Sequence, residues 1–184
     1  MTTGHALWLN ARTLEDLGEL TAQWLEGRIS LLPAYAADAP AAETRGLIPH
    51  LAAFNRAGYV TTESQPGVPV DEDGGQRAFV SGFASEATIH AVEAAILGTR
   101  LVTLVSPPGR NSPYSIPVTM LMQGNDPCTF LGTPLSRSDV VAFYSDDCPL
   151  AVPMLVNAWQ LDVFDPEWGD NTLLWETLAE VLKG

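Results

Sequence analysis

Three groups of polar side chains in this sequence are of the types that bind or transform a small molecule. The first is Glu63, Ser64 and Gln65, which stand directly before the turn residues 66–67. We predict Glu63 as a catalytic general base or a ligand-orienting carboxylate, and Ser64 and Gln65 as ligand-binding residues. Ser64 lacks the small-residue elbow and the nearby histidine of a nucleophile, so the group favours binding over bond cleavage. The alternative is a polar turn whose side chains cap their own backbone.

The second group is Gln76 and Arg77, at the entry to a predicted strand over 78–84. Arginine presents a forked donor that suits a carboxylate or a phosphate of a ligand. Arg110, in a proline-rich loop, is a further predicted counter-charge for an anionic part of the ligand. The alternative for Arg77 is an exposed ion pair with the acidic run 71–73, which would contribute little to stability.

The third group is Asp165 and Glu167, two carboxylates on either side of Pro166, with Trp168 close behind. Paired carboxylates can divide acid and base work or hold a divalent cation, although both uses need further ligands. We predict Asp165 as a second catalytic candidate and Glu167 as a ligand-binding residue. The alternative is a tight turn that places Trp168 in the core.

Hydrophobic periodicity predicts helices and strands in alternation along the chain. Thr13 and Asp16 form a capping-box pattern ahead of a helix over 14–27, and Ser85 caps a helix that Gly98 ends. The other predicted elements are a second helix through 47–54, strands over 59–62, 78–84, 101–105, 118–122 and 158–164, a short helix near 137–144, and a C-terminal helix beginning near 170–171. The pattern assigns no element to 149–156.

This order of elements predicts a single domain over 1–184, of the α/β or α+β class. We expect a mixed sheet of about five strands with two N-terminal helices and a C-terminal helix packed on it. Trp24 and Trp175 are expected on buried helix faces. If the first, third and fifth predicted strands pair in parallel, the loops after them leave from one rim of the sheet. The three polar groups would then line one pocket.

The composition indicates a globular protein with a strongly acidic surface. Hydrophobic residues make up 46% of the 184 positions, which is enough for one core. The 22 acidic and 9 basic residues give a net charge of −13. A chain with this charge repels phosphate backbones and anionic lipids, so we expect neither a nucleic-acid partner nor a membrane partner.

The cysteines and histidines do not form a metal-binding pattern. Cys128 and Cys148 have no paired histidines at zinc-finger spacing, so we expect no bound metal. The N-terminus lacks the basic start and apolar run of a signal peptide, and no apolar segment is long enough to cross a bilayer. These features favour a cytoplasmic location with reduced thiols.

Several enzyme classes are excluded because the residues that they need are absent. The only lysine is Lys183, so the chain has no P-loop lysine, no kinase-like lysine and no internal lysine for a Schiff base. No Gly-x-Gly-x-x-Gly follows a predicted strand, which argues against a dinucleotide. We therefore expect no cofactor.

Four blocks of the sequence, in their order, resemble a known family. They are TLEDLGELTAQWLEG, LIPHLAAFNRAGYVTTESQPG, QRAFVSGFA and FDPEWGDNTLLWETL. The chain is similar, from end to end, to an uncharacterised family of small actinobacterial proteins known only as a domain of unknown function. The resemblance implies no activity, cofactor or site.

Two hypotheses for function follow. In the first, the protein binds or acts on a small polar metabolite in a pocket formed by strand-end loops, and whether it is an enzyme stays open. In the second, it is an acidic protein-interaction module, for instance an accessory, immunity or anti-defence protein that docks on a basic partner. The polar groups after apolar strands favour the first hypothesis.

Overall fold

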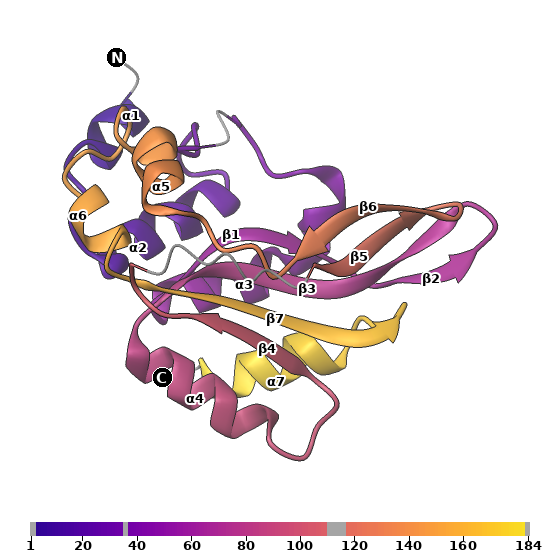
Figure 1. Cartoon of the computed structure of the whole chain (residues 1–184). Coiled ribbons are helices and arrows are strands. Elements are labelled where there is room, and N and C mark those ends of the chain that lie inside the picture. The colour runs from indigo at the N-terminus through magenta and orange to yellow at the C-terminus, as the bar shows by residue number, and fades with distance from the viewer. Residues whose placement is uncertain (1–2, 35–36, 110–116, 183–184) are drawn as a thin grey trace.

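The computed structural model describes residues 3–34, 37–109 and 117–182. Its helices are α1 (Thr3–Trp8), α2 (Leu14–Leu25), the 3-10 helix η1 (Ala42–Leu47), α3 (Ile48–Arg56), α4 (Glu86–Ile96), α5 (Arg137–Tyr144), α6 (Val152–Leu155) and α7 (Leu173–Val181). Its strands are β1 (Tyr59–Gln65), β2 (Val68–Asp71), β3 (Gly74–Ala84), β4 (Val102–Ser106), β5 (Val118–Gln123), β6 (Asp126–Leu131) and β7 (Trp159–Trp168). Helices α4 and α7 lie on one side of the sheet, and α1, α5 and α6 gather at one end on the other side (Figure 1).

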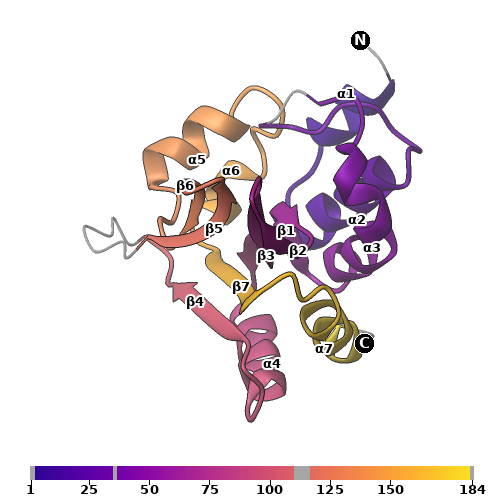
Figure 2. The same ribbon diagram turned by 90° about the vertical axis from the view of Figure 1, so that its right-hand side faces the viewer.

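All strand pairs in the described part of the chain are antiparallel, and β3 is at the centre of the sheet. β3 pairs with β2 and β5 along its first half and with β1 and β7 along its second half. β4 adds to β7 and β6 adds to β5, so the path across the sheet is β4-β7-β3-β5-β6 (Figure 2). The α+β class is confirmed, and the described residues form a sheet of seven strands, which is more than expected.

The expectation that strands 59–62, 101–105 and 158–164 are parallel neighbours is wrong. Helix α4 does connect two strands, β3 and β4, that run in the same direction, but β7 lies between them and is antiparallel to both. β1 and β7 also run in the same direction, and β3 separates them. The order of elements along the chain does not reveal a late strand that enters between two earlier ones, and this is why the expectation failed.

Three strands extend further than the hydrophobic pattern indicated. β1 continues to Gln65, β3 begins at Gly74, and β7 continues to Trp168. The three polar groups therefore lie within paired strands and not in loops after them. The strands accommodate these residues with register shifts, between Thr61 and Glu63 in β1 and in the β3–β7 pair.

Two edge strands, two α-helices and most of the 3-10 helix η1 were not predicted. β2 and β6 contain Pro69 and Pro127, and proline removes a ladder donor, which hides such strands from a pattern-based reading. Helix α6 lies inside the segment 149–156, to which the pattern assigned no element. Helix α1, at Thr3–Trp8, precedes the first predicted helix.

Side-chain alternation along β3 divides the core between the two faces of the sheet. Ala78, Val80 and Ala84 belong to the largest hydrophobic cluster, which also includes residues of α3, α4 and α7. Phe79 and Phe83 point to the opposite face, where they belong to two separate smaller clusters. One face of the sheet thus carries a single large hydrophobic cluster, whereas the other face carries two smaller clusters.

The first and last predicted helices are confirmed. Thr13 and Asp16 form the predicted capping box of α2. Trp24 and Trp175 are buried, with 7% and 2% of their surfaces exposed, and each indole N–H donates a hydrogen bond. No helix in the described ranges is both long and apolar enough to cross a bilayer.

We expect Trp175→Ala to lower the free energy of unfolding by about 3–5 kcal/mol, because it leaves a large cavity between α7 and α3. The ring of Trp175 stacks on Phe54 with a centroid distance of 6.4 Å, so the loss includes an aromatic contact. Urea unfolding followed by circular dichroism measures the change. Leu97→Ala, at a residue that is 80% exposed, is the matched control and should change stability little. Equal stabilities for the two variants would contradict this packing of α7.

Candidate functional site

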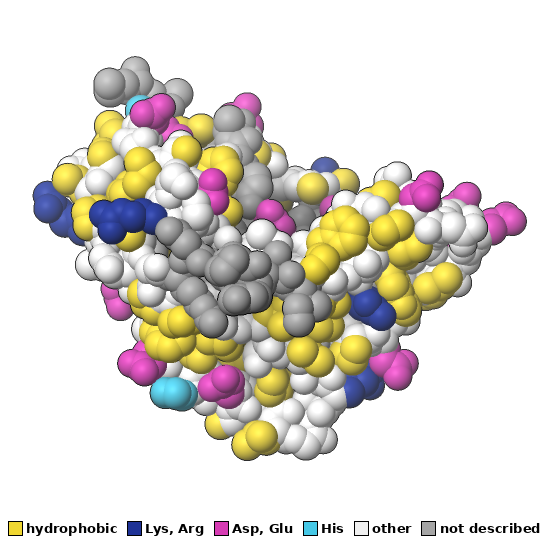
Figure 3. All heavy atoms as spheres, in the orientation of Figure 1, with side chains coloured by type: hydrophobic (Ala, Val, Ile, Leu, Met, Phe, Trp, Pro, Cys, Tyr) yellow, Lys and Arg dark blue, Asp and Glu magenta, His cyan; other side chains and the backbone are white. Residues whose placement is uncertain are grey.

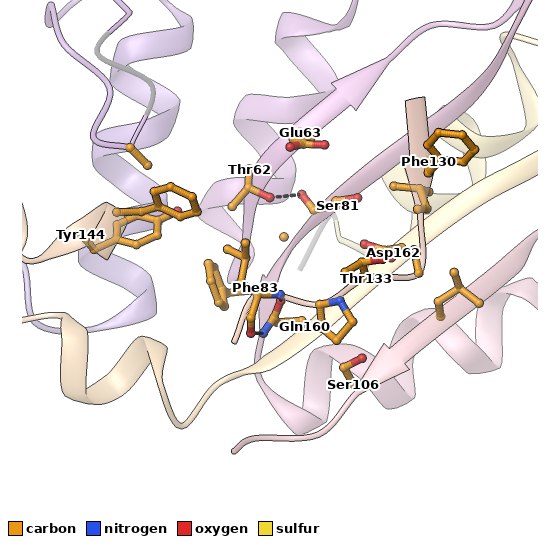
Figure 4. Close-up of a pocket in the computed structure, with 18 residues that line it drawn as sticks. Thr62, Glu63, Ser81, Phe83, Ser106, Phe130, Thr133, Tyr144, Gln160 and Asp162 are labelled. Carbon is orange, nitrogen blue, oxygen red and sulfur yellow. Dashed lines mark hydrogen bonds between the residues drawn. The ribbon is translucent and has the colours of Figure 1, made fainter. Parts of the chain in front are cut away.

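A cavity of about 270 Å³ lies on the face of the sheet opposite α4 and α7. Its floor carries Glu63 from β1, Ser81 from β3 and Asp162 from β7, and we call it the sheet cavity. Figure 4 shows these three side chains with Phe83 and Tyr144 to one side and Phe130 to the other. Other lining residues come from β4, from α5 and from the connection between β6 and α5.

Strand register brings the three floor residues together. Glu63 is directly opposite Ser81, and Ser81 is directly opposite Asp162, so the three lie in one row across β1, β3 and β7. Residues directly opposite one another share a face of the sheet. Between Thr61 and Glu63 the pairing slips by one residue, which is a β-bulge. Because of this bulge Glu63, and not Thr62, pairs with Ser81.

The cavity forms in a gap between two hydrophobic clusters. Phe79 and Phe83 flank Ser81 on the same face of β3. Phe79 packs in the cluster with Met120 and Leu131, whereas Phe83 packs in the cluster with residues of α2, α5 and α6. The polar row of the floor lies between the clusters and joins neither of them.

The environment of Asp162 disfavours the ionised form of its carboxyl. Burial raises the pKa of its carboxyl, and the nearby Glu63 carboxylate raises it further. The Ser81 hydroxyl and the backbone N–H of Gly132 oppose this rise in pKa because they favour the ionised form. Burial also raises the pKa of the Tyr144 phenol, and the nearby Cys148 and Glu63 side chains raise it further.

Ser81 carries a buried hydroxyl with unused hydrogen-bonding capacity. The residue is 8% exposed, and its Oγ makes no hydrogen bond of ordinary geometry with the described residues. The Oγ nevertheless lies close enough to Asp162 to lower the pKa of that carboxyl. A buried polar atom without a full partner is costly, so an unsatisfied hydroxyl on a cavity floor is typical of a group that meets a ligand.

Two side chains of β7 hold one wall of the cavity in place. The Gln160 amide accepts a hydrogen bond from the Leu135 N–H at 2.7 Å and donates one to the Leu135 carbonyl at 2.8 Å. Asp162 accepts a hydrogen bond from the N–H of Gly132 at 3.3 Å. The connection 132–135 between β6 and α5 is therefore fixed against the sheet.

Aromatic side chains form the apolar part of the cavity. Phe83 and Tyr144 meet edge to face with their ring centroids 6.0 Å apart. Phe130 and Phe143 also line the cavity, and they are 47% and 46% exposed, so they lie where the cavity opens to solvent. Exposed aromatic rings at the opening of a polar cavity favour a ligand with an apolar part.

A second cavity, of about 450 Å³, lies along the outer edge of β1, and we call it the edge cavity. Thr62 and Glu63 line both cavities, and Ser64 and Gln65 line the edge cavity. The Gln65 amide N–H₂ donates to the backbone carbonyls of Arg77 and Met120, both at 3.2 Å. Its donors therefore tie β1 to β3 and β5.

Gln76 and Arg77, the second predicted group, make structural contacts. The Gln76 amide donates to the Pro66 carbonyl at 3.0 Å. Arg77 lies over the ring of Trp168, 4.3 Å from its centroid, and donates to the carbonyls of Pro166 and Thr119. Burial lowers the pKa of Arg77, but the guanidinium stays charged at neutral pH. The ion pair with 71–73 that was the alternative for Arg77 is not among its described contacts.

Asp165 and Glu167, the third predicted group, do not lie at either cavity. Asp165 is fully buried and accepts two hydrogen bonds from Arg100, at 2.8 and 2.7 Å. Arg100 also contacts Asp170, so the three residues join β7 to the start of α7. Asp165 and Asp162 are three positions apart in one strand and so point to opposite faces of the sheet. Glu167 is exposed and donates its backbone N–H to Asp165.

The structure thus separates the predicted site residues. Among the described residues, Glu63 reaches the sheet cavity and the edge cavity, and Ser64 and Gln65 reach the edge cavity alone. Arg110 lies outside the described residues. The sequence reading missed Ser81 and Asp162, although both occupy polar positions in strands whose neighbouring positions are apolar.

The described residues contain no group of three side chains placed to hold a metal ion. The arrangement in the sheet cavity is therefore one of carboxylates, a hydroxyl and aromatic rings. Carboxylates can accept hydrogen bonds, carry negative charge toward a ligand and exchange protons with it.

Comparison with known proteins assigns the chain to a family without assigning it an activity. The family model described as Domain of unknown function (DUF6919) matches residues 3–184. The chain belongs to this family. No curated protein matches the chain. For this DUF6919 protein, the chemistry of the site has to come from its own residues.

We expect Asp162→Asn to stabilise the protein at neutral pH relative to the parent chain. The folded-state pKa of Asp162 is raised, so the ionised form is disfavoured by folding, and the parent loses stability as the pH rises from about 4 through the raised pKa. The asparagine variant does not titrate at this position. Its advantage should therefore be complete above the raised pKa and should disappear toward pH 4. If folding makes the Asp162 carboxyl a tenfold weaker acid, the parent loses about 1.4 kcal/mol of stability when this group ionises.

Thermal melts of both proteins between pH 4 and pH 8 measure this difference. Asp126→Asn, at an exposed residue of β6, controls for the change in net charge. A difference in stability between Asp162→Asn and the parent that is constant across the pH range would show that the Asp162 carboxyl is not disfavoured by burial.

Proposed function

We propose that this DUF6919 protein binds a small polar molecule in the sheet cavity. The observation that carries the proposal is the buried Ser81 hydroxyl, which lies between the carboxylates of Glu63 and Asp162 in one row of the sheet and makes no hydrogen bond of ordinary geometry with the described residues. Placing a half-buried carboxylate beside a buried hydroxyl lowers the stability of the fold, and a ligand that donates hydrogen bonds to both groups offsets this cost.

The dimensions of the cavity support a small ligand. A dry cavity of roughly 150 Å³ accommodates benzene, so about 270 Å³ suits a molecule of roughly twice that size. The wall 132–135, held by Gln160 and Asp162, gives the cavity a fixed shape. Because the walls of the cavity are already ordered, ligand binding does not carry the entropic cost of ordering them.

The carboxylates also permit proton transfer to a bound molecule. Burial and Glu63 raise the pKa of Asp162, which moves it toward the range in which a carboxyl exchanges protons near neutral pH. Binding is the function that the geometry supports best, because strand register places the hydrogen-bonding groups of Glu63, Ser81 and Asp162 side by side. The actinobacterial origin rests on the sequence resemblance, and a cytoplasmic location is supported by Cys128 and Cys148, which are both free thiols.

We expect Ser81→Ala to weaken ligand binding without destabilising the free protein. Removing a buried hydroxyl that lacks a full partner is neutral or stabilising for the apo form, whereas the loss of one ligand hydrogen bond costs about 1 kcal/mol, or roughly fivefold in affinity. The measurement is the thermal shift produced by fractionated small-molecule extract on the parent and on the variant.

Ser145→Ala, at an exposed residue just after α5, is the matched control and should keep the full thermal shift. The proposal fails if no fraction stabilises the parent protein. It also fails if Ser81→Ala retains the full ligand-induced shift.

A second candidate function, docking on a basic protein, is favoured by a separate part of the surface. The ends of β2, β3, β5 and β6 form an arm whose tip carries acidic side chains (Figures 1 and 3). The tip residues Asp71, Glu72, Asp73 and Asp126 are exposed, and Val70 on the neighbouring edge strand β2 is 61% exposed. An exposed edge strand beside concentrated negative charge suits a basic partner.

We expect that replacing both Asp71 and Asp73 with asparagine would weaken such a complex in the same direction as added salt, because both changes reduce attraction between opposite charges. Co-purification with the partner at low and high salt measures this. Glu86→Gln, at an exposed position on α4 away from the arm, is the control. A complex that survives both the double substitution and high salt would exclude the acidic tip as the contact.

A further inference from the structure

The described part of the sheet-cavity lining contains carboxylic acids and no cationic side chain. Its titratable members are the carboxylic acids Glu63 and Asp162 and the phenol Tyr144, and the described lining includes no lysine, arginine or histidine. The proximity of Glu63 is one cause of the raised pKa of Asp162. A positively charged ligand group reduces the repulsion between the two carboxylates, whereas an anion increases it.

Three hydrogen-bond acceptors come together on the cavity floor. They are the carboxylates of Glu63 and Asp162 and the Oγ of Ser81, on three adjacent strands at one register level. The Ser81 Oγ is buried and has lone pairs to offer. A primary ammonium group carries three N–H donors on one atom and matches this set, whereas an alcohol has one donor and a quaternary ammonium has none.

The rest of the cavity suits an apolar body attached to that donor group. Phe83 and Tyr144 form an edge-to-face pair beside the floor, and Phe130 and Phe143 line the exposed side. After a head group has been placed on the floor, a cavity of about 270 Å³ retains space for roughly one aromatic ring. Contact with these rings also favours a cation held close to them.

We propose that the ligand of the sheet cavity is a primary amine that binds as its ammonium form, with the nitrogen between Glu63, Ser81 and Asp162 and a small aromatic or aliphatic body against Phe83 and Tyr144. This inference rests on the proposed function, because it names the chemical class of the molecule that the cavity binds. It adds a prediction that a general small-molecule site does not make, namely strong discrimination by the charge of the head group.

The experiment compares three probes of nearly equal shape: 2-phenylethylamine, 2-phenylethanol and phenylacetate. Isothermal titration calorimetry at pH 7 on the full chain measures their affinities. We expect the amine to bind, the alcohol to bind roughly tenfold more weakly because it lacks the charge, and phenylacetate not to bind. Equal affinity for the amine and the alcohol, or binding of phenylacetate alone, would overturn the inference.

Two substitutions locate the bound amine. Asp162→Asn should weaken amine binding roughly tenfold or more and should leave binding of the alcohol within about twofold, because only the charged hydrogen bond is lost. Asp126→Asn on the exposed arm makes the same change in net charge away from the cavity and should leave both affinities unchanged. If both substitutions weaken amine binding equally, the amine is attracted by net charge and does not occupy the sheet cavity.

The pH dependence of binding gives a readout that a merely structural role of Asp162 would not produce. Amine affinity should fall as the pH drops through the raised pKa of Asp162, because the protonated carboxyl has lost its charge. Among the described lining residues, Glu63 and Tyr144 are the other titratable groups, and Asp162→Asn should flatten the part of the profile that belongs to Asp162. A profile that is identical in the variant would exclude contact between the amine and Asp162.

Failure of this inference can be distinguished from failure of the proposed function. If fractions of the small-molecule extract stabilise the parent but not Ser81→Ala, while no amine probe binds, the cavity binds small molecules of another class. If neither the extract nor any probe has an effect, both the amine class and the small-molecule function are wrong.

Discussion

The pairing of β3 with four other strands is the constraint on which the rest of the structure depends. β1 approaches β3 so closely that a Cβ atom on Gly82 would lie 2.2 Å from the Val60 carbonyl oxygen, a distance that no side chain tolerates. The buried Tyr59 hydroxyl, at the start of β1, lies within hydrogen-bond distance of the carbonyls of Val80 and Leu161, at 3.0 and 2.8 Å. It therefore links β1 with both β3 and β7. Without glycine at position 82 this register could not form, and the row of polar side chains on the opposite face would not exist.

The polar row lowers the stability of the fold, and the hydrophobic cluster on the other face of the sheet offsets this cost. Burial disfavours the ionised form of the Asp162 carboxyl, and the Ser81 hydroxyl makes no hydrogen bond of ordinary geometry within the described part of the chain. On the helix-covered face, the same strands contribute Val80, Leu161 and Val163 to the largest hydrophobic cluster. Alternation along each strand allows one segment to serve both purposes, because successive side chains point to opposite faces.

The sequence predicted local structure better than it predicted the site, and the reason is physical. The capping box at Thr13 and the apolar periodicity around Trp175 are local signals, so α2 and α7 could be predicted from short windows. Strand pairing depends on contacts between distant segments, and nothing in a window around Asp165 reveals which face of which strand it occupies. Asp165 forms a carboxylate pair with Glu167 after an apolar run, which is the pattern of a candidate site, yet its carboxylate is bound by Arg100, 65 positions earlier in the chain. Asp162 lies within that same run and reaches the cavity because the register places it opposite Ser81.

The bulge in β1 explains why a polar corner at Glu63 to Gln65 is compatible with a regular sheet. Without the extra residue, Thr62 would pair with Ser81, and Glu63 would pair with Val80 on the helix-covered face. A carboxylate there would be buried among aliphatic side chains, at a cost of several kcal/mol. With the bulge, Glu63 joins Ser81 and Asp162, and the hydrophobic cluster on the helix side stays apolar. The single inserted residue therefore both protects the core and completes the cavity floor, which links the stability of this fold directly to the composition of its site.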